Sequence, residues 1–373
     1  MSEAPRLETL SSVSPETNSN DEFIRLRARV AEVMYVEQAR TDSDTMATFT
    51  GKLRMDSDEA YRHLRQRLAS MGYVPLLREG ESDRQVVIAV KGNLTAEAPA
   101  RVWLSLALFL ATVVTTTIFG GLFAFSVSRP SGPLTLQAVL ANGIPFSLTL
   151  LAILGMHELG HYIQARRHNL PVTLPYFIPV PLPGTLGTLG AFIQMRGAVE
   201  NRRVLFDVGL GGPIAGLVVA VPLYVVGLLT SEIAPSPAPD NRSLLTQFLI
   251  ALFLPEAIDN GIYLNPVLLA ARFGLVVTAI NLLPVGQLDG GHIAYAALGG
   301  TWARRLGLAV IGLMAVLGIT ASPSWFVWMA FALFSAAAQA RPLDDITQLD
   351  TPRMLSFFGA VAILVAIFTA RPL

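Results

Sequence analysis

Long apolar stretches follow one another through the last three quarters of the chain, separated by short polar segments. Because a helix needs about 20 apolar residues to cross a bilayer, the pattern predicts a polytopic α-helical membrane protein with about seven transmembrane helices. Residues 244–254 make only half a span, so we expect an interfacial or re-entrant piece there. The expected spans are residues 102–125, 144–165, 204–229, 264–286, 306–321, 324–338 and 354–370.

The first quarter of the chain has a different pattern. Residues 1–20 are polar and predict a disordered tail, whereas residues 21–98 predict a small soluble α+β domain. Its expected elements are a helix from Asp21, broken strands, a helix capped by Ser57, and a hairpin that turns at residues 79–82. A membrane domain over residues 99–373 follows.

Composition agrees with this division. Hydrophobic residues make up 52% of the chain and charged residues 14%, against roughly 25% charged in a soluble domain. The net charge is zero, so no basic excess points to nucleic acid as a partner. The chain has no cysteine, which excludes disulfides, a thiol nucleophile and a thiolate metal site.

Arginines in the loops predict the orientation. Pairs such as Arg166 with Arg167, and Arg304 with Arg305, follow the second and fourth expected spans and therefore fall on one side. By the positive-inside rule that side is cytoplasmic, and so is the N-terminus. We expect a multi-pass protein of the bacterial inner (plasma) membrane.

Three ionisable residues interrupt the second span: His157, Glu158 and His161. Such groups are costly at membrane depth and are functional candidates by default. Histidines four apart lie on one face of a helix and can bind one metal ion, which leaves Glu158 beside it. Zinc activates water for attack on a carbonyl, and a neighbouring carboxylate can take the proton.

A catalytic zinc site usually has three protein ligands, so a third is sought. Asp289 is favoured, because it follows a proline break, is flanked by glycines and falls near the cytoplasmic side with the histidines. His292 is possible, whereas His168 is read as a solvated loop residue. Asp207 is read as a helix N-terminal or ion-paired carboxylate near Arg203.

Two motifs, "HELGH" in one span and "NLLPVGQLDGG" in another, resemble the site-2 protease family of intramembrane zinc metalloproteases, a resemblance that extends to "GGPIAG" at residues 211–216. It implies that His157, His161 and Asp289 bind Zn²⁺ and that Glu158 activates water. It also implies that Asn281 helps hold the substrate carbonyl; a helix-to-helix hydrogen bond is the alternative. The soluble N-terminal domain is similar to that of cyanobacterial and plastid members.

A glycine-flanked apolar segment, "TLGTLGAFIQMRG", predicts a membrane-associated β-hairpin on the side of the zinc. We hypothesise that its strand pairs with an unwound substrate segment by edge addition. The candidate substrate-binding residues are Gly190, Ala191, Phe192, Ile193, Gln194 and Met195. A plain cytoplasmic hairpin is the alternative.

The prediction is therefore an intramembrane zinc metalloendopeptidase in regulated proteolysis, with a membrane-protein substrate helix and the lipid bilayer as partners. A transporter would be expected to show internal repeats and scattered ionisable residues, which the sequence lacks. A catalytically silent scaffold would be expected to lose the glutamate or a ligand. Arg272, inside the fourth span, is expected to snorkel to the interface or to pair internally.

Overall fold

The computed structural model describes residues 15–92, 101–128, 132–235, 242–336 and 341–369. The chain divides into two compact units. The first, unit 1, contains residues 1–95 together with residues 343–347, and the second, unit 2, contains the remainder. Residues 1–14 of the expected disordered tail lie outside the described residues.

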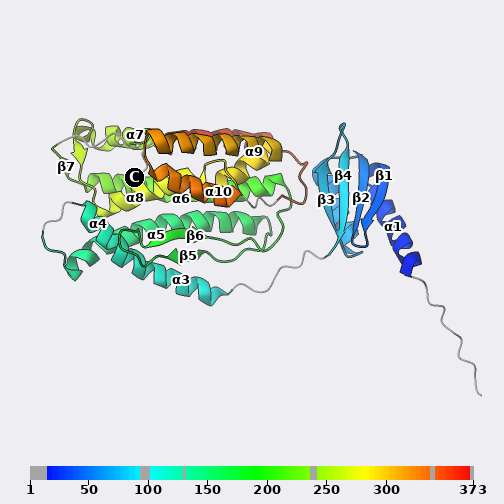
Figure 1. Cartoon of the computed structure of the whole chain (residues 1–373), viewed down its shortest axis with the longest axis horizontal. Helices are drawn as coiled ribbons and strands as arrows, with labels where there is room; N and C mark the ends of the chain where they lie inside the picture. The colour runs from blue at the N-terminus through cyan, green and yellow to red at the C-terminus, as the bar shows by residue number, and fades with distance from the viewer. Residues whose placement is uncertain (1–14, 93–100, 129–131, 236–241, 337–340, 370–373) are drawn as a thin grey trace, which may run out of the picture. The chain divides into compact units, whose positions relative to one another are not determined.

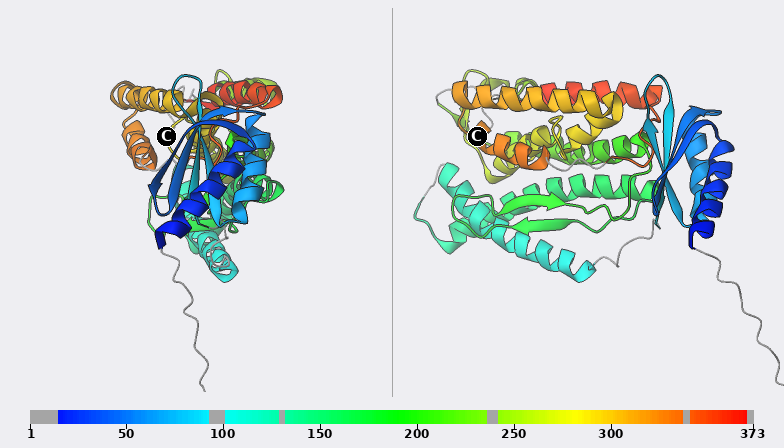
Figure 2. Two further views of the ribbon diagram at one scale, coloured as in Figure 1. Left: turned by 90° about the vertical axis from the view of Figure 1, so that its right-hand side faces the viewer. Right: turned by 45° about the vertical axis from the view of Figure 1, so that its right-hand side comes forward.

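Unit 1 is an antiparallel sheet with two helices. The strand order is β1-β2-β4-β3, and neighbouring strands are in register at pairs such as Phe49↔Val87 and Leu77↔Val87. Figure 2 shows α1 against one face of this sheet. Its elements are α1 (Pro15–Ala31), β1 (Met34–Ser43), β2 (Met46–Leu53), α2 (Ser57–Ala69), β3 (Tyr73–Glu79) and β4 (Gln85–Lys91).

Two local expectations in unit 1 differ from the structure. The first helix begins at Pro15, six residues before the expected Asp21. The cap of α2 is Asp56 and not Ser57, because the Asp56 carboxylate accepts the backbone N–H of Asp58. An aspartate ahead of a serine competes for the same role, since both cap helices well.

The free edge of β3 is occupied by a segment from near the other end of the chain. The Leu77 amide donates to the Leu343 carbonyl at 2.9 Å, and the Asp345 amide donates to the Leu77 carbonyl at 3.1 Å. Leu77 and Asp344 thus form a parallel bridge, and Leu343 joins the apolar core of unit 1. The Thr347 hydroxyl lies 2.7 Å from that of Ser57. Residues 343–347, called the returning segment below, complete the sheet edge, which the sequence analysis did not anticipate.

Unit 2 is built from helices that run side by side (Figure 1). Between α3 and α4 lies the π-helical turn η1 (Thr116–Gly120), and α9 contains a break at Gly299, whose φ is 77°. Its helices are α3 (Val102–Thr115), α4 (Gly121–Val127), α5 (Leu136–Arg167), α6 (Arg202–Leu229), α7 (Leu244–Phe253), the short η2 (Pro255–Ala257), α8 (Pro266–Asn281), α9 (Asp289–Thr320), α10 (Ser324–Ala336) and α11 (Thr351–Ile367).

Within the described residues, four helices are long and apolar enough to cross a membrane: Val102–Val127, Leu136–Arg167, Arg202–Leu229 and Asp289–Thr320. The expected count of seven spans is therefore not confirmed. The expected span 264–286 is a helix of 16 residues, about 24 Å long at 1.5 Å per residue, because it ends at Asn281 before a compact turn. The expected span 306–321 is the second part of a 32-residue helix. The half-span at residues 244–254 is α7.

Two short antiparallel sheets accompany the helices. β5 (Tyr176–Pro179) pairs with β6 (Thr188–Phe192), with Tyr176 opposite Phe192, which is the hairpin that the sequence predicted. This sheet packs between α3 and α5 (Figure 1). The second sheet joins β7 (Ile233–Ala234) to β8 (Gly261–Ile262).

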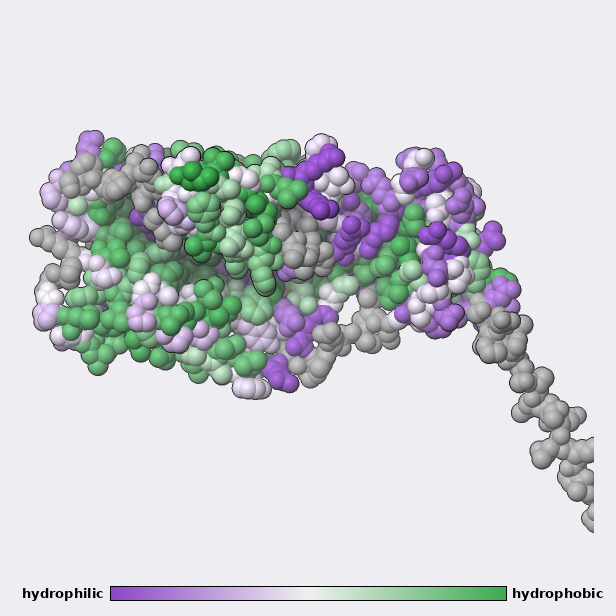
Figure 3. Space-filling model, in the orientation of Figure 1, coloured by the Kyte–Doolittle hydropathy of each residue, from purple (hydrophilic) through white to green (hydrophobic). Residues whose placement is uncertain are grey.

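The surface of unit 2 is strongly apolar, as Figure 3 shows on one face. Each long helix leaves large apolar side chains uncovered; Trp103, Leu148 and Val218 are each about two-thirds exposed. Such a contiguous apolar exterior is unfavourable in water and is typical of a lipid-facing surface. Unit 2 therefore has the exterior of a multi-pass membrane protein.

Candidate metal centre

Helix α5 carries the three ionisable residues of the histidine motif. His157, Glu158 and His161 are only 4%, 6% and 7% exposed. The helix is uninterrupted through the motif, so the two imidazoles lie one above the other on the face that meets α6 and α8. Their Nε2 atoms are 3.1 Å apart.

Asp289 reaches the histidines from the first turn of α9. The α8–α9 connection is compact because Gly290 and Gly291 lie against the backbone of residues 282–286, where a Cβ would come within 2.0–2.3 Å of a carbonyl oxygen. One carboxylate oxygen of Asp289 lies 3.1 Å from His157 Nε2, and the other lies 3.2 Å from His161 Nε2.

These three side chains have the geometry of a zinc site. Zinc holds nitrogen and oxygen ligands at about 2.0–2.1 Å in a tetrahedron, which places neighbouring ligand atoms roughly 3.3 Å apart. The observed separations of 3.1–3.2 Å match that edge length. His157, His161 and Asp289 are also the one group of possible metal ligands found within the described residues. The donor set therefore fits a divalent cation.

The surroundings of His161 set the tautomer and the position of its imidazole in a way that suits a metal ligand. Its Nδ1 lies 2.7 Å from the Val208 carbonyl oxygen of α6, so the Nδ1–H donates there and Nε2 keeps its lone pair for a metal. The imidazole rests directly on Gly212, where an added Cβ would lie 2.1 Å from His161 Nε2. One turn later Gly216 faces His157 less closely, with an added Cβ 3.3 Å from the nearest atoms.

Glu158 and Asn281 complete the polar surroundings. The Glu158 carboxylate is buried and accepts a hydrogen bond from the backbone amide of Ile193. The Asn281 amide nitrogen, at the end of α8, lies 3.4 Å from His157 Nε2. Asn281 thus lies beside the three candidate ligands. Its amide group makes a contact between α8 and α5, and it also brings an N–H donor to the site.

The structure brings the candidate substrate-binding residues to the same place. Gly190, Ala191 and Phe192 belong to β6, while Ile193 and Gln194 follow it. The Thr173 amide donates to the Gln194 carbonyl, and Met195 pairs with Val172. Phe192 is 47% exposed and Leu189 is 77% exposed. The strand therefore presents apolar side chains outward while the residue after it contacts Glu158.

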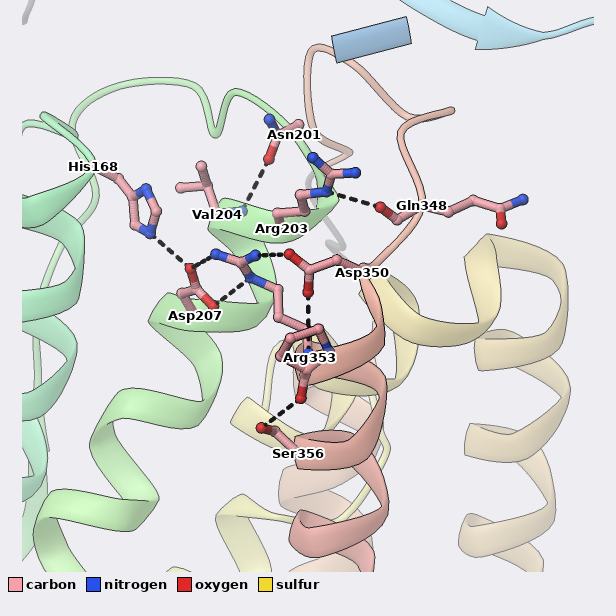
Figure 4. Close-up of polar contacts among 10 residues, drawn as sticks. His168, Asn201, Arg203, Val204, Asp207, Gln348, Asp350, Arg353 and Ser356 are labelled. Carbon is pink, nitrogen blue, oxygen red and sulfur yellow. Dashed lines mark hydrogen bonds and ion pairs between the residues drawn. The ribbon is translucent and has the colours of Figure 1, made fainter. Parts of the chain in front are cut away.

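Other titratable residues that the sequence singled out lie outside the ligand group. His168 pairs with Asp207 at 2.8 Å, so it is not a solvated loop residue. Asp207 is ion-paired, with the Arg353 guanidinium at 2.6–2.8 Å as its main partner (Figure 4). The sequence did not link these residues, because Arg353 follows 146 positions later. Nδ1 of His292 is buried without a hydrogen-bond partner among the described residues.

Comparison with known proteins points to one family. Residues 145–320 match the model of peptidase family M50. The probable zinc metalloprotease EGY2, chloroplastic, of Oryza sativa subsp. indica is 29% identical over 314 residues, which cover 80% of this chain and 57% of that protein. The probable zinc metalloprotease EGY1, chloroplastic, of Oryza sativa subsp. japonica is 29% identical over 367 residues, covering 87% and 62%.

A third relative, the probable zinc metalloprotease EGY1, chloroplastic, of Arabidopsis thaliana, is 31% identical over 241 residues, covering 61% of this chain and 43% of that protein. The chain thus spans less than two thirds of the length of these relatives. No solved structure matches. Residues 145–320, which contain the three candidate ligands and Glu158, form a domain of peptidase family M50, the site-2 protease family of zinc metallopeptidases.

Proposed function

We propose that the chain is an intramembrane zinc endopeptidase that hydrolyses peptide bonds in the transmembrane segments of other membrane proteins. The observation that carries this proposal is the buried triangle of His157, His161 and Asp289 with Glu158 beside it. His157 lies ten residues before the end of α5, about 15 Å along the helix axis. That depth favours a substrate that is itself within the bilayer.

The residues of the site have separate roles in the proposed reaction. Zn²⁺ held by the two imidazoles and the Asp289 carboxylate would supply a Lewis acid that polarises the substrate carbonyl and acidifies water. Glu158 takes the proton from the attacking water at its carboxylate and passes it to the departing amide nitrogen. The Asn281 amide N–H donates to the developing oxyanion.

The substrate must be extended before it can be cut, because a helical peptide bond is shielded by its own hydrogen bonds. We infer that β6 and residues 193–195 pair with the unwound segment through backbone hydrogen bonds. Two observations support this role. The backbone amide of Ile193 donates a hydrogen bond to Glu158, the proposed general base. The exposed apolar side chains of β6 also suit a substrate segment that comes from the lipid.

Metal content and cleavage together test the proposal. We expect about one zinc ion per chain in wild-type protein and in Glu158→Gln, with cleavage of a model transmembrane substrate in proteoliposomes lost only in the variant. Removing a general base typically costs 10²–10⁴-fold. Asp289→Ala should lose both zinc and cleavage. A wild-type protein without zinc, or a fully active Glu158→Gln, would contradict the enzyme and favour the transporter or scaffold.

The role of β6 needs its own variant. Phe192→Pro removes one strand amide and should abolish cleavage while zinc content is unchanged. Phe192→Ala removes the same side chain but keeps the strand amide, so it is the matched control and should retain cleavage. Equal cleavage by Phe192→Pro and wild type would remove the strand-addition hypothesis.

The kind of membrane that holds the protein, and the process that its cleavage serves, are also proposals. The relatives are named as chloroplastic, whereas we expected a bacterial inner membrane, and the loop arginines predict a cytoplasmic N-terminus. We propose that cleavage serves regulated intramembrane proteolysis and that the N-terminus is cytoplasmic. Protease accessibility of an N-terminal tag in sealed vesicles tests that orientation.

A further inference from the structure

Unit 2 contains a cavity of about 100 Å³ among α6, α7, α8 and the end of α11. Two arginines, Arg242 and Arg272, line it together with Tyr224, Ser243 and Thr246. Apolar side chains such as Ile250 and Leu275 make up much of the rest of the wall. With Thr369, six polar residues thus line a space that holds about three water molecules at roughly 30 Å³ each.

Arg272 is the unusual member of this group. It lies in the second turn of α8, and the described residues give its guanidinium no hydrogen bond and no ion pair. The polar groups nearest to it are the Arg242 guanidinium and the neutral Tyr224 phenol. No aspartate or glutamate is among the residues that line the cavity. Arginine stays protonated in proteins, so this half-buried charge has no counter-charge among the described residues.

Arg242 is held in place by the loop before α8. One of its terminal guanidinium nitrogens donates to the backbone carbonyl oxygens of Ala257 and Asn260, at 3.3 and 3.2 Å. That anchoring leaves the other N–H groups of Arg242 for a ligand in the cavity. Ser243 and Thr246 add hydroxyl groups at the start of α7, where the backbone amides also favour an anion.

We propose that this cavity binds a phosphate group, carried by an anionic membrane lipid or supplied as free phosphate. Two guanidinium groups are the side chains that best match phosphate oxygens, because their N–H donors bind in a fork. The ligand supplies the negative charge that Arg272 otherwise lacks. The apolar wall also continues along α8 as a narrow crevice, which shares Val276 and Thr369 with the cavity.

The proposed site is separate from the metal centre. Tyr224 follows Gly216, which contacts His157, by eight residues along α6, and this separates the two sites by about 12 Å along the helix axis. Arg272 similarly precedes Asn281 by nine residues in α8. In Figure 1 the nearby elements α7 and β7 lie together at the left end of unit 2. Ligand binding there can be measured without reference to cleavage.

Thermal unfolding of the full chain in detergent tests the proposal. Sodium phosphate and short-chain phosphatidylglycerol are compared with sodium chloride at equal ionic strength and with diacylglycerol, which lacks the phosphate. We expect a rise of roughly 3–8 °C in the unfolding midpoint with phosphatidylglycerol, as mass action predicts for a ligand of the folded state. A rise with sodium phosphate as well identifies free phosphate as a sufficient source.

Arg272→Met should abolish this rise, and it should not destabilise the ligand-free protein, because it removes a half-buried charge that has no ion pair among the described residues. Arg304→Gln, an exposed arginine of α9, is the matched control and should respond like wild type. If Arg272→Met fails to fold, Arg272→Lys keeps the charge and should weaken binding at least tenfold. An unresponsive wild type, or an Arg272 variant that responds fully, would overturn the proposal.

Discussion

Replacing Gly212 should test most directly how the protein positions the candidate metal ligands. It lies on α6 beneath the His161 imidazole, and an added Cβ would lie 2.1 Å from Nε2, with the two adjacent ring carbons at 2.5 Å. The ring cannot stay there after a Gly212→Ala substitution. It also cannot turn freely, because its Nδ1–H is bound to the Val208 carbonyl and its surroundings are buried.

The size of the effect follows from these distances. Ordinary contact between a Cβ and a ring atom requires about 3.4 Å or more, so the imidazole or the helix must move by about 1.3 Å. Ligand distances in a zinc site tolerate only about ±0.2 Å. Changes in groups that merely orient a ligand already cost about 10–100-fold in metal affinity. We therefore expect Gly212→Ala to lower zinc affinity at least tenfold and to abolish cleavage.

Gly216→Ala is the matched control. It lies one turn along the same helix, and its added Cβ would be 3.3 Å from His157 atoms, a contact that a shift of a few tenths of an ångström relieves. Both substitutions gain up to about 1 kcal/mol of helix propensity, so this gain cancels in the comparison. Zinc per chain by elemental analysis, and competition with a fluorescent chelator, measure the difference. Equal zinc affinity in the two variants would refute the packing argument.

Two further predictions concern groups at the ends of the helices and in unit 1. Burial raises the pKa of Asp344 above its ordinary value near 3.8, so the folded state binds the proton more tightly. Unit 1 should therefore lose stability as pH rises from about 3.8 through the raised pKa, and Asp344→Asn should remove that loss, as amide exchange in β3 against pH would measure. Arg353→Met leaves the Asp207 and Asp350 carboxylates without their guanidinium partner. It should cost roughly 1–3 kcal/mol of stability, and an unchanged thermal midpoint would show the ion pairs to be dispensable.

Local patterns allowed most elements to be predicted, together with the three candidate metal ligands that the structure brings into one group. The spacing of His157 and His161 depends only on the period of a helix, and a hairpin turn such as that after Glu79 depends on adjacent residues. Asp289 could be favoured because a proline and two glycines mark a turn at a helix start. Such signals lie within one or two elements of the chain.

Other features depend on residues that meet only in the folded chain. Nothing near Asp207 in the sequence indicates Arg353, and nothing near Leu77 indicates Leu343. The count of seven spans is not confirmed, because four helices of the described structure are long and apolar enough to cross a membrane while others, such as α8, are shorter. Arg272 was expected to snorkel to the interface or to pair internally, and in the described structure its side chain lines a cavity.

The returning segment also bears on how the chain is made. Lys91, the last residue of β4, and Leu343 are separated by roughly 250 residues, which a ribosome takes about 12–50 s to add at 5–20 residues per second. During that time the amide and carbonyl groups of Leu77 have no strand to bond, and an open sheet edge invites pairing with other chains. A chain that ends before Leu343 would keep this edge open permanently, so truncated products should be more prone to aggregation than the whole protein.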